Sequence, residues 1–206
     1  NLSSIMHGQG PAVEAMVEKA VAILEALARE SPQDTGVRTN LASTYQRAAI
    51  IFTGDKRTPR SIAQGVAFYR KAVETLRALA VDLPRDNRIP KLLAQNLVGL
   101  ANSLVLAGEP READRLIGEA VAIAARLAAV DQGNAEGATD QLSVLAQAAL
   151  VAHRAGDPPR AIGHARAALA IAARLPGDTR RSRDVRSDVA DTRATLGRAL
   201  VARAGA

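Results

Sequence analysis

Three histidines are the side chains in this 206-residue sequence whose type and spacing come closest to a metal site. His153 and His164 flank Gly156, on what we expect to be successive helices, so their imidazoles could approach one another. A metal site needs further ligands, and no cysteine, Glu-x-x-His motif or aspartate-rich set accompanies them. His7 lies in an N-terminal segment that we expect to be irregular. We therefore predict no metal site, and surface or partly buried histidines instead.

Motifs for catalysis are also missing from the sequence. The strings at residues 7–10 and 133–137 contain glycines, but they lack the preceding strand and the lysine of a phosphate-binding loop. No Gly-x-Ser-x-Gly elbow occurs, and no base accompanies the serines. We predict no catalytic residue and no cofactor, and we expect that this chain is not an enzyme.

Charge is unevenly distributed along the chain. The net charge is +6 at pH 7, and residues after 150 include eleven arginines and five aspartates, whereas residues 104–150 are acidic. The densest basic cluster, Arg-Arg-Ser-Arg at 180–183, could bind phosphate or an acidic partner. Charge runs usually face solvent, so we expect a loop whose arginines pair with Asp178, Asp184 and Asp188.

Small aliphatic residues dominate the apolar composition. Hydrophobic residues make up 48% of the chain, with two Phe, two Tyr and no Trp. Small side chains let helices approach closely, whereas the scarcity of aromatic side chains for base stacking disfavours nucleic-acid binding. No apolar run approaches the roughly 18 residues of a membrane span, so we expect no membrane insertion.

Internal repetition is the strongest signal in the sequence. Four segments superimpose at intervals of 52, 48 and 48 residues: 20–27, 72–79, 120–127 and 168–175. Within each, apolar residues recur at the spacings of one helical face, and a breaker and a second helical segment follow. A close-contact column of small residues recurs in the second segments, at Ala49, Ala101, Ala149 and Gly197. The pattern predicts an all-α chain of about eight helices in antiparallel pairs.

The turns at residues 107–110 and 155–158 read Ala-Gly-Glu-Pro and Ala-Gly-Asp-Pro. Each leads into the next helix that contains one of the four superimposed segments. Small apolar columns around these glycines, with Ala113 and Ala120 after Gly108, make the chain resemble the tetratricopeptide repeat family. The resemblance implies a right-handed superhelical solenoid that binds a protein or peptide. The period exceeds the family's 34 residues, and the large aromatic that opens the motif is absent except at Tyr45.

The long period, with Arg-Thr-Asn-Leu-Ala at 38–42 and Arg-Ser-Asp-Val-Ala at 186–190, is similar to regions C-terminal to bacterial serine/threonine kinase domains. No kinase motif is present. This second resemblance implies a signal-sensing module of a larger bacterial signalling protein. It would be extracytoplasmic if the parent is membrane-anchored, and cytoplasmic otherwise.

The tetratricopeptide resemblance also implies which residues line a concave groove. In that family the first helix of each pair faces the groove, and the helical segments described above as second segments correspond to those first helices. We expect a mixed polar and aliphatic groove without the lysine-rich carboxylate clamp of chaperone-binding members. It suits an extended or helical peptide. The groove residues are Ser43, Gln46, Gln95, Val98, Asn102, Val105, Ser143, Leu150, His153, Asp191 and Arg198.

We expect an irregular segment at 1–10 and a single repeat domain at 11–206, with units of about 11–36, 37–86, 87–134, 135–183 and 184–206. The chain begins without an initiator methionine, which suggests part of a longer protein. Two alternatives to partner binding remain open. One is a structural or self-association role for the first helix, which lacks a pairing helix, and the other is nucleic-acid binding through the C-terminal arginines.

Overall fold

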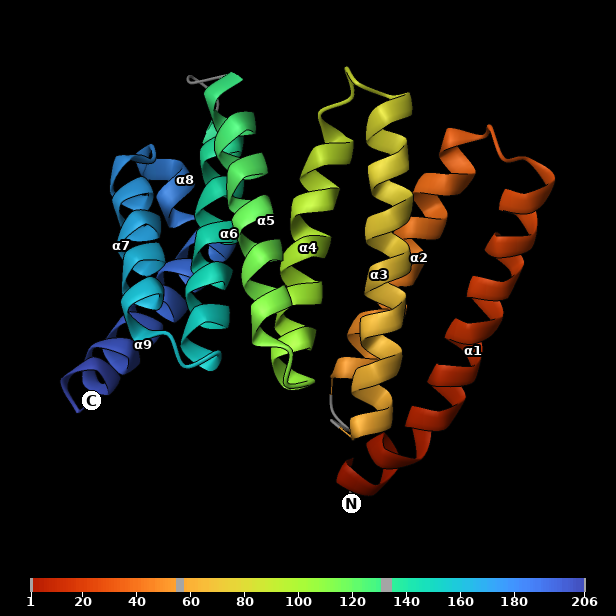
Figure 1. Ribbon diagram of the computed structural model, residues 1–206, viewed down its shortest axis with the longest axis horizontal. Helices are drawn as coiled ribbons and strands as arrows, with labels where there is room; N and C mark the ends of the chain where they lie inside the picture. The colour runs from red at the N-terminus through yellow and green to blue at the C-terminus, as the bar shows by residue number, and fades with distance from the viewer. Residues whose placement is uncertain (1, 55–57, 131–134, 206) are drawn as a thin grey trace. The chain divides into compact units, whose positions relative to one another are not determined.

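The computed structural model describes residues 2–54, 58–130 and 135–205, with side chains described from residue 12 onward. Over these ranges the chain is all-α and contains no strand (Figure 1). The helices are α1 (Leu2–Glu30), α2 (Thr35–Thr53), α3 (Pro59–Asp82), α4 (Arg88–Leu106), α5 (Pro110–Val130), α6 (Ala135–Arg154), α7 (Pro158–Arg174), α8 (Gly177–Arg181) and α9 (Arg183–Ala204).

Eight of the described helices are long, as the repeats predict, and α8 is an additional single turn. The expectation of an irregular segment at 1–10 was wrong for residues 2–10, because α1 begins at Leu2. That expectation placed the start of the first helix at Pro11. A proline inside a helix removes one backbone hydrogen bond without ending every helix that contains it.

The chain divides into two compact units, residues 1–89 and 90–206, and each is described by itself. In the first unit α2 packs against both α1 and α3. In the second unit α6 contacts α5, α7 and α9, and α9 also contacts α7 and α8. Each unit is a stack of antiparallel helices of the helical-repeat type. A single repeat domain over 11–206 remains a prediction.

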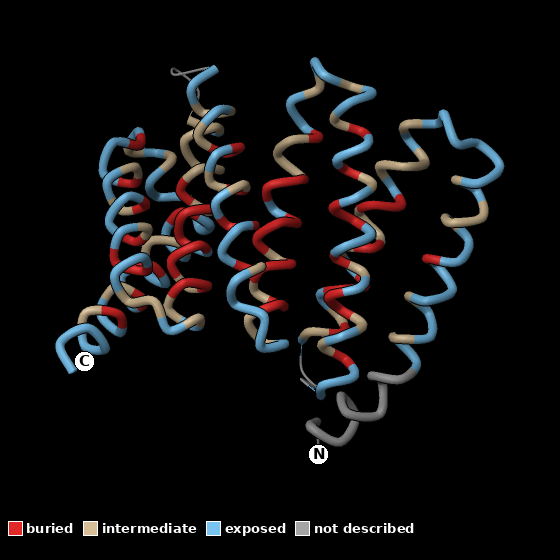
Figure 2. The backbone as a smooth tube through the Cα atoms, in the orientation of Figure 1, coloured by how far each residue is buried: buried red, intermediate tan, exposed pale blue. Residues whose placement is uncertain are grey.

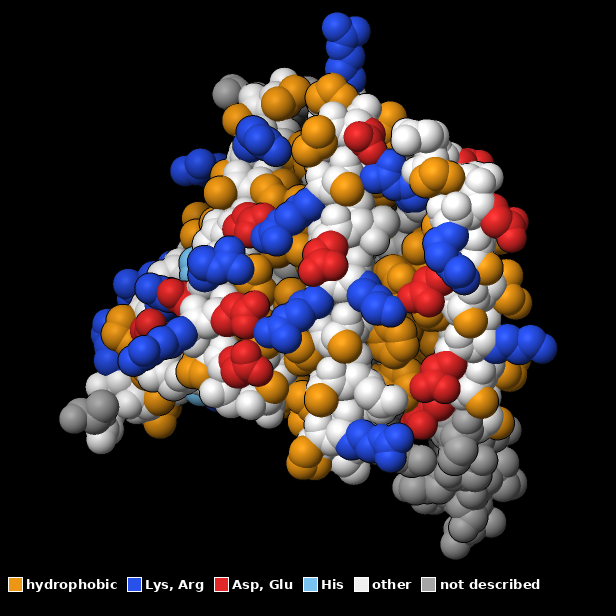
Figure 3. Space-filling model, turned by 45° about the vertical axis from the view of Figure 1, so that its right-hand side comes forward, with side chains coloured by type: hydrophobic (Ala, Val, Ile, Leu, Met, Phe, Trp, Pro, Cys, Tyr) orange, Lys and Arg blue, Asp and Glu red, His pale blue; other side chains and the backbone are white. Residues whose placement is uncertain are grey.

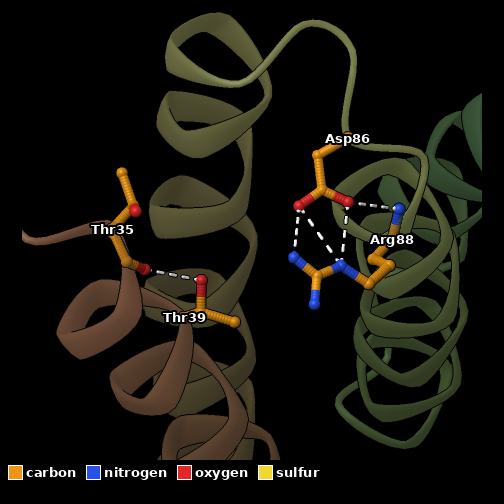
Figure 4. Close-up of polar contacts among 4 residues, drawn as sticks. All are labelled: Thr35, Thr39, Asp86 and Arg88. Carbon is orange, nitrogen blue, oxygen red and sulfur yellow. Dashed lines mark hydrogen bonds and ion pairs between the residues drawn. The ribbon is translucent and has the colours of Figure 1, made fainter.

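One repeat position supplies the cap at the start of the first helix of a pair. Asp34 accepts hydrogen bonds from the backbone N–H groups of Gly36 at 2.8 Å and Val37 at 3.0 Å, where α2 begins. Asp86 accepts from the N–H of Arg88 at 2.9 Å where α4 begins, and it also pairs with the Arg88 guanidinium (Figure 4). These caps satisfy amide groups that would otherwise lack a partner.

The same repeat position in the last copy is Ser182, which caps α9 by accepting from the N–H of Val185 at 3.4 Å. The cap column therefore recurs at the intervals read from the sequence. In α2 a further local bond joins the hydroxyl of Thr39 to the carbonyl oxygen of Thr35 at 2.7 Å (Figure 4).

Two glycines end the first helices of the middle pairs in the same way. Gly108 has φ of 84° and Gly156 has φ of 77°, in the left-handed region that favours glycine. The next residue, Glu109, donates from its N–H to the carbonyl oxygen of Leu104 at 2.8 Å, and Asp157 bonds Ala152 at 3.0 Å. This is the Schellman arrangement, and it confirms both predicted turns.

The buried residues, drawn red in Figure 2, are largely small and aliphatic in each unit. The close-contact column is confirmed at Ala49, Ala101 and Ala149, each with no exposed surface. Gly197, in the last copy, is exposed instead. Helix α9 packs on α6, α7 and α8, and Gly197 lies on an exposed face of it.

The second unit has an apolar core between α6, α7 and α9. Leu142 and Leu145 of α6, Ala168 of α7 and Val185 of α9 form one buried cluster. Burying a leucine or valine side chain stabilises a fold by roughly 1.5–3 kcal/mol. This cluster fixes α9 beside α6 and α7, and so positions the polar residues discussed below.

Candidate functional site

Polar contacts join the first helices of successive pairs in the second unit. The ammonium group of Lys91 on α4 lies 2.9 Å from Glu136 Oε1 and 2.9 Å from Asp140 Oδ2, both on α6. Burial lowers the pKa of Lys91, but the hydrogen bonds that its ammonium group donates to Asp140 and Glu136 outweigh that effect and raise the pKa. Lys91 is therefore fixed as a cation at one end of the α4–α6 contact.

Two further contacts continue this polar line. Arg154 Nη1 on α6 donates to Asn102 Oδ1 on α4 at 2.5 Å. Between α6 and α9, Ser143 is hydrogen-bonded to Asp188. Burial raises the pKa of Asp188, and the Ser143 hydroxyl partly offsets that shift. The first helices α4, α6 and α9 are thus linked by side-chain hydrogen bonds as well as by apolar packing.

A small recess of about 60 Å³ opens beside these contacts, and we call it with its rim the α4–α6 groove. The recess residues used below are Lys91, Gln95, Val98, Asp140, Ser143 and Gln147, with Ala124 and Leu127 of α5 at its base. Its volume is that of about two water molecules, so it can receive one small side-chain group and no larger ligand. Gln95 and Gln147 are exposed at its rim.

The structure brings together three of the groove residues predicted from sequence, because Gln95, Val98 and Ser143 all line this recess. Val98, however, is only 1% exposed, so it contributes to the floor and presents almost no surface to a partner. Asn102 lies further along α4, half-buried beside Arg154. Val105, Leu150 and His153 are also half-buried.

The other predicted groove residues lie elsewhere. On α9, Asp191 is exposed, and Arg198 donates to the hydroxyl of Thr195 at 3.1 Å. Ser43 and Gln46 lie half-buried on α2 in the first unit, where the Ser43 hydroxyl donates to the carbonyl oxygen of Thr39 at 3.1 Å. That hydroxyl is already used within α2.

Gln147 and Lys91 line the recess but were not predicted. Both lie four residues from a predicted position on the same helix, Gln147 after Ser143 and Lys91 before Gln95. Residues four apart share a helical face, so this spacing alone could have identified them.

A cavity of about 830 Å³ lies between α7, α8 and α9. We call it the arginine pocket. Its cationic lining residues are Arg180, Arg183, Arg186 and Arg193, and its aliphatic lining comes from Leu169, Ala172, Ala173, Val185, Val189 and Ala190. None of its described lining residues is acidic.

The expected pairing of the 180–183 cluster with three aspartates was mostly wrong. Arg181 lies 3.6 Å from Asp178, but no ion pair joins the cluster to Asp184 or Asp188 within the described residues. Asp188 is half-buried and bonded to Ser143 on α6, away from the cluster. Arg186 and Arg193, seven residues apart on one face of α9, complete the pocket instead, and that helical spacing was the missed signal.

The two described histidines lie in different surroundings. His153 is half-buried, and its buried Nδ1 has no hydrogen-bond partner among the described residues. Burial and the positive charge of Arg160 lower the pKa of His164, with Asp157 acting in the opposite direction. No group of three possible metal ligands occurs among the described residues, and the side chain of His7 lies outside them.

Helix α4 is more apolar than we expected from the sequence. By length and composition, α4 could cross a membrane, and among the described helices it alone meets that test. In this structure 56% of its apolar window is buried within the protein, as in the core helix of a folded domain.

Comparisons with known proteins yield neither a matching family model nor a matching curated protein. Among solved structures, the de novo designed helical repeat protein DHR64 is 16% identical, with 94% of this chain and 99% of that chain covered and a TM-score of 0.38. BtubC (BKLC) from P. vanneervenii is 18% identical, with coverages of 93% and 90% and a TM-score of 0.41. A third match, the DHF79 filament, is 18% identical, with coverages of 89% and 97% and a TM-score of 0.34.

Proposed function

We propose that this chain is a non-catalytic, protein-binding helical-repeat module of the tetratricopeptide type. The observation that carries the proposal is the α4–α6 groove, where Gln95 and Gln147 expose amide groups beside a recess with an aliphatic base. Amides can donate to and accept from a peptide backbone, and the recess can receive one small side chain. This combination suits an extended or helical peptide laid across α4 and α6.

The charge of the groove refines the expected partner. Lys91 is already paired with Glu136 and Asp140, so it does not offer a free cation to a carboxylate. Figure 3 shows acidic and basic side chains interspersed on the face that it presents. We therefore expect recognition through amide contacts and small apolar groups. The kinase-like resemblance suggests the sensing region of a larger bacterial signalling protein as the setting.

A capture experiment tests the groove. Immobilised wild-type chain and a Gln95→Arg, Gln147→Arg variant are compared in lysate of the source organism, with Ala122→Arg on the exposed side of α5 as the matched control. Quantitative mass spectrometry should find a protein that wild type and control retain and that the groove variant loses. If every captured protein binds all three chains equally, the groove is not the binding site.

A second candidate function is self-association through α1. Its large apolar side chains Val13, Met16, Ile23 and Leu27 are 39%, 72%, 53% and 43% exposed, and their spacing places them on one helical face. Helix α1 packs on α2 through other residues, Val17, Val21 and Leu24, so this exposed stripe is available for contact with another apolar face. Sedimentation over a hundredfold concentration range tests it. A concentration-independent monomer excludes self-association, whereas a dimer should be dissociated by Met16→Glu with Ile23→Glu.

A further inference from the structure

The arginine pocket is a second surface with a chemistry of its own. Its volume of about 830 Å³ is within the range of ligand-binding cavities and more than ten times that of the α4–α6 recess. Two helices of the buried core, α7 and α9, form its walls. The pocket is thus built on well-packed elements, with the short helix α8 at one side.

Its four arginines are available to a ligand. Arg180, Arg183, Arg186 and Arg193 are exposed, and none of them makes an ion pair with a described residue. Among the nearby aspartates, Asp178 pairs with Arg181 and Asp188 bonds Ser143, while the exposed Asp184 and Asp191 form no ion pair with the four arginines within the described residues. A cluster of like charges without counter-charges is costly, so an anion that enters the pocket gains from all four.

The pocket also has a substantial aliphatic surface. Leu169 and Val189 are half-buried there, and Ala173 and Ala190 are exposed. A polyphosphate or a nucleic-acid backbone would gain little from such a surface, and no aromatic side chain lines the pocket to stack on a base. A peptide that alternates acidic and aliphatic residues matches both parts of the lining.

We infer that the arginine pocket binds an acidic protein segment that carries aliphatic side chains between its carboxylates. Guanidinium groups bind carboxylates through paired hydrogen bonds, while the leucine or valine side chains of the segment cover the aliphatic wall. The inference rests on the proposed protein-binding role and adds a site that does not overlap the α4–α6 groove. The two sites share no lining residue.

Fluorescence anisotropy with the full 206-residue chain tests this inference. The probe is a fluorescein-labelled peptide with two leucines, each flanked by pairs of glutamates, and a matched peptide has serine in place of leucine. We expect the leucine peptide to bind more tightly than the serine peptide, and both to weaken as salt increases. Equal affinity for the two peptides would overturn the role of the aliphatic wall.

Variants at exposed positions separate the pocket from the rest of the surface. Arg186→Glu with Arg193→Glu should weaken peptide binding by at least about tenfold, whereas Arg126→Glu, an exposed position on α5, should leave it within about twofold. Ala190→Glu places in the pocket a negative charge, the same sign as that of the peptide, and should also weaken binding. Ala170→Glu on α7 is its control. Circular dichroism confirms that each variant is folded.

Two further measurements distinguish failure of the pocket inference from failure of the proposed function. A single-stranded oligothymidylate that competes better than the leucine peptide would overturn the assignment to a protein ligand. The groove variant Gln95→Arg, Gln147→Arg should bind the peptide like wild type. If the peptide fails to bind while the groove still captures its partner, the inference about the pocket fails and the proposed function stands.

Discussion

Arg154 donates a hydrogen bond from Nη1 to Asn102 Oδ1 at 2.5 Å, across 52 positions of sequence. The two residues lie on α6 and α4, the first helices of successive pairs. A hydrogen bond from a charged donor to a neutral acceptor is stronger than one between two neutral groups. The bond therefore ties neighbouring repeats together beside the α4–α6 groove.

This link predicts a measurable coupling between the two side chains. Asn102→Ala and Arg154→Ala should each lower the free energy of unfolding, and the double variant should lose less than their sum by about 0.5–1 kcal/mol, since Arg154 is exposed. Urea unfolding of all four proteins measures the coupling. Strict additivity would mean that the bond contributes nothing to stability.

Close approach of α2 and α3 predicts opposite effects of alanine at two glycines. A Cβ at Gly65 would lie 2.3 Å from Thr53 Cγ2 and 3.2 Å from the carbonyl oxygen of Ala49, whereas one at Gly118 would meet nothing within 4 Å. Gly65→Ala should therefore destabilise the chain by about 1–3 kcal/mol. Gly118→Ala in α5 should stabilise it by about 0.5–1 kcal/mol. Thermal unfolding of both variants tests the contrast, and equal shifts would contradict it.

The repeats made the helices predictable, because a column of small residues and a recurring turn constrain the backbone locally. Gly108 and Gly156 could be placed at turns from their repeat position alone. The same alignment could have predicted the caps, since Asp34, Asp86 and Ser182 share one column. Local hydrogen-bonding requirements are visible in sequence when they recur.

Interactions between helices were harder to predict. The 180–183 cluster was assigned as a paired loop, but Asp188 bonds Ser143 on α6 instead, and the arginines line a cavity with Arg193. Which carboxylate an arginine meets depends on packing between helices that are distant in sequence. For the same reason Val98 was expected at the surface, whereas it is buried.

The two Schellman turns predict a conformational cost for any side chain there. Gly108→Ala and Gly156→Ala would force a Cβ into left-handed φ values of 84° and 77°. Each should lower stability by about 1–2 kcal/mol, although neither Cβ would meet an atom within 4 Å. Urea unfolding measures the loss, with Gly163→Ala on α7, in open space and helical, as the control. The control should not lose stability, and a change at Gly108 or Gly156 no more destabilising than that of the control would contradict the strain.

The Glu25 carboxylate predicts acid sensitivity in the first unit. It accepts from Lys71 Nζ at 2.8 Å and Tyr45 Oη at 2.7 Å, and these two bonds lower its pKa. A lowered pKa in the folded chain means that the stabilisation is present above the ordinary value of 4.5 and is lost as the pH falls below it. Glu25→Gln should flatten the loss of stability over that range. An unchanged pH profile in urea unfolding would contradict this assignment.

His164 predicts a pH effect at milder acidity. Burial disfavours its charged form, and Arg160 adds repulsion that Asp157 only partly offsets, so its pKa falls below the ordinary 6.5. The unfolded chain then binds this proton more tightly, and stability declines as the pH falls from 6.5 toward the lower pKa of the folded protein.

NMR titration of the His164 imidazole should give a midpoint below 6.5, with His153→Gln used to assign the resonance. Arg160→Gln should raise that midpoint, because it removes the nearby positive charge, whereas Arg126→Gln on α5 should not change it. A midpoint at or above 6.5 would show that the imidazole is not desolvated at the α7 surface. A midpoint that Arg160→Gln leaves unchanged would assign the whole shift to burial alone.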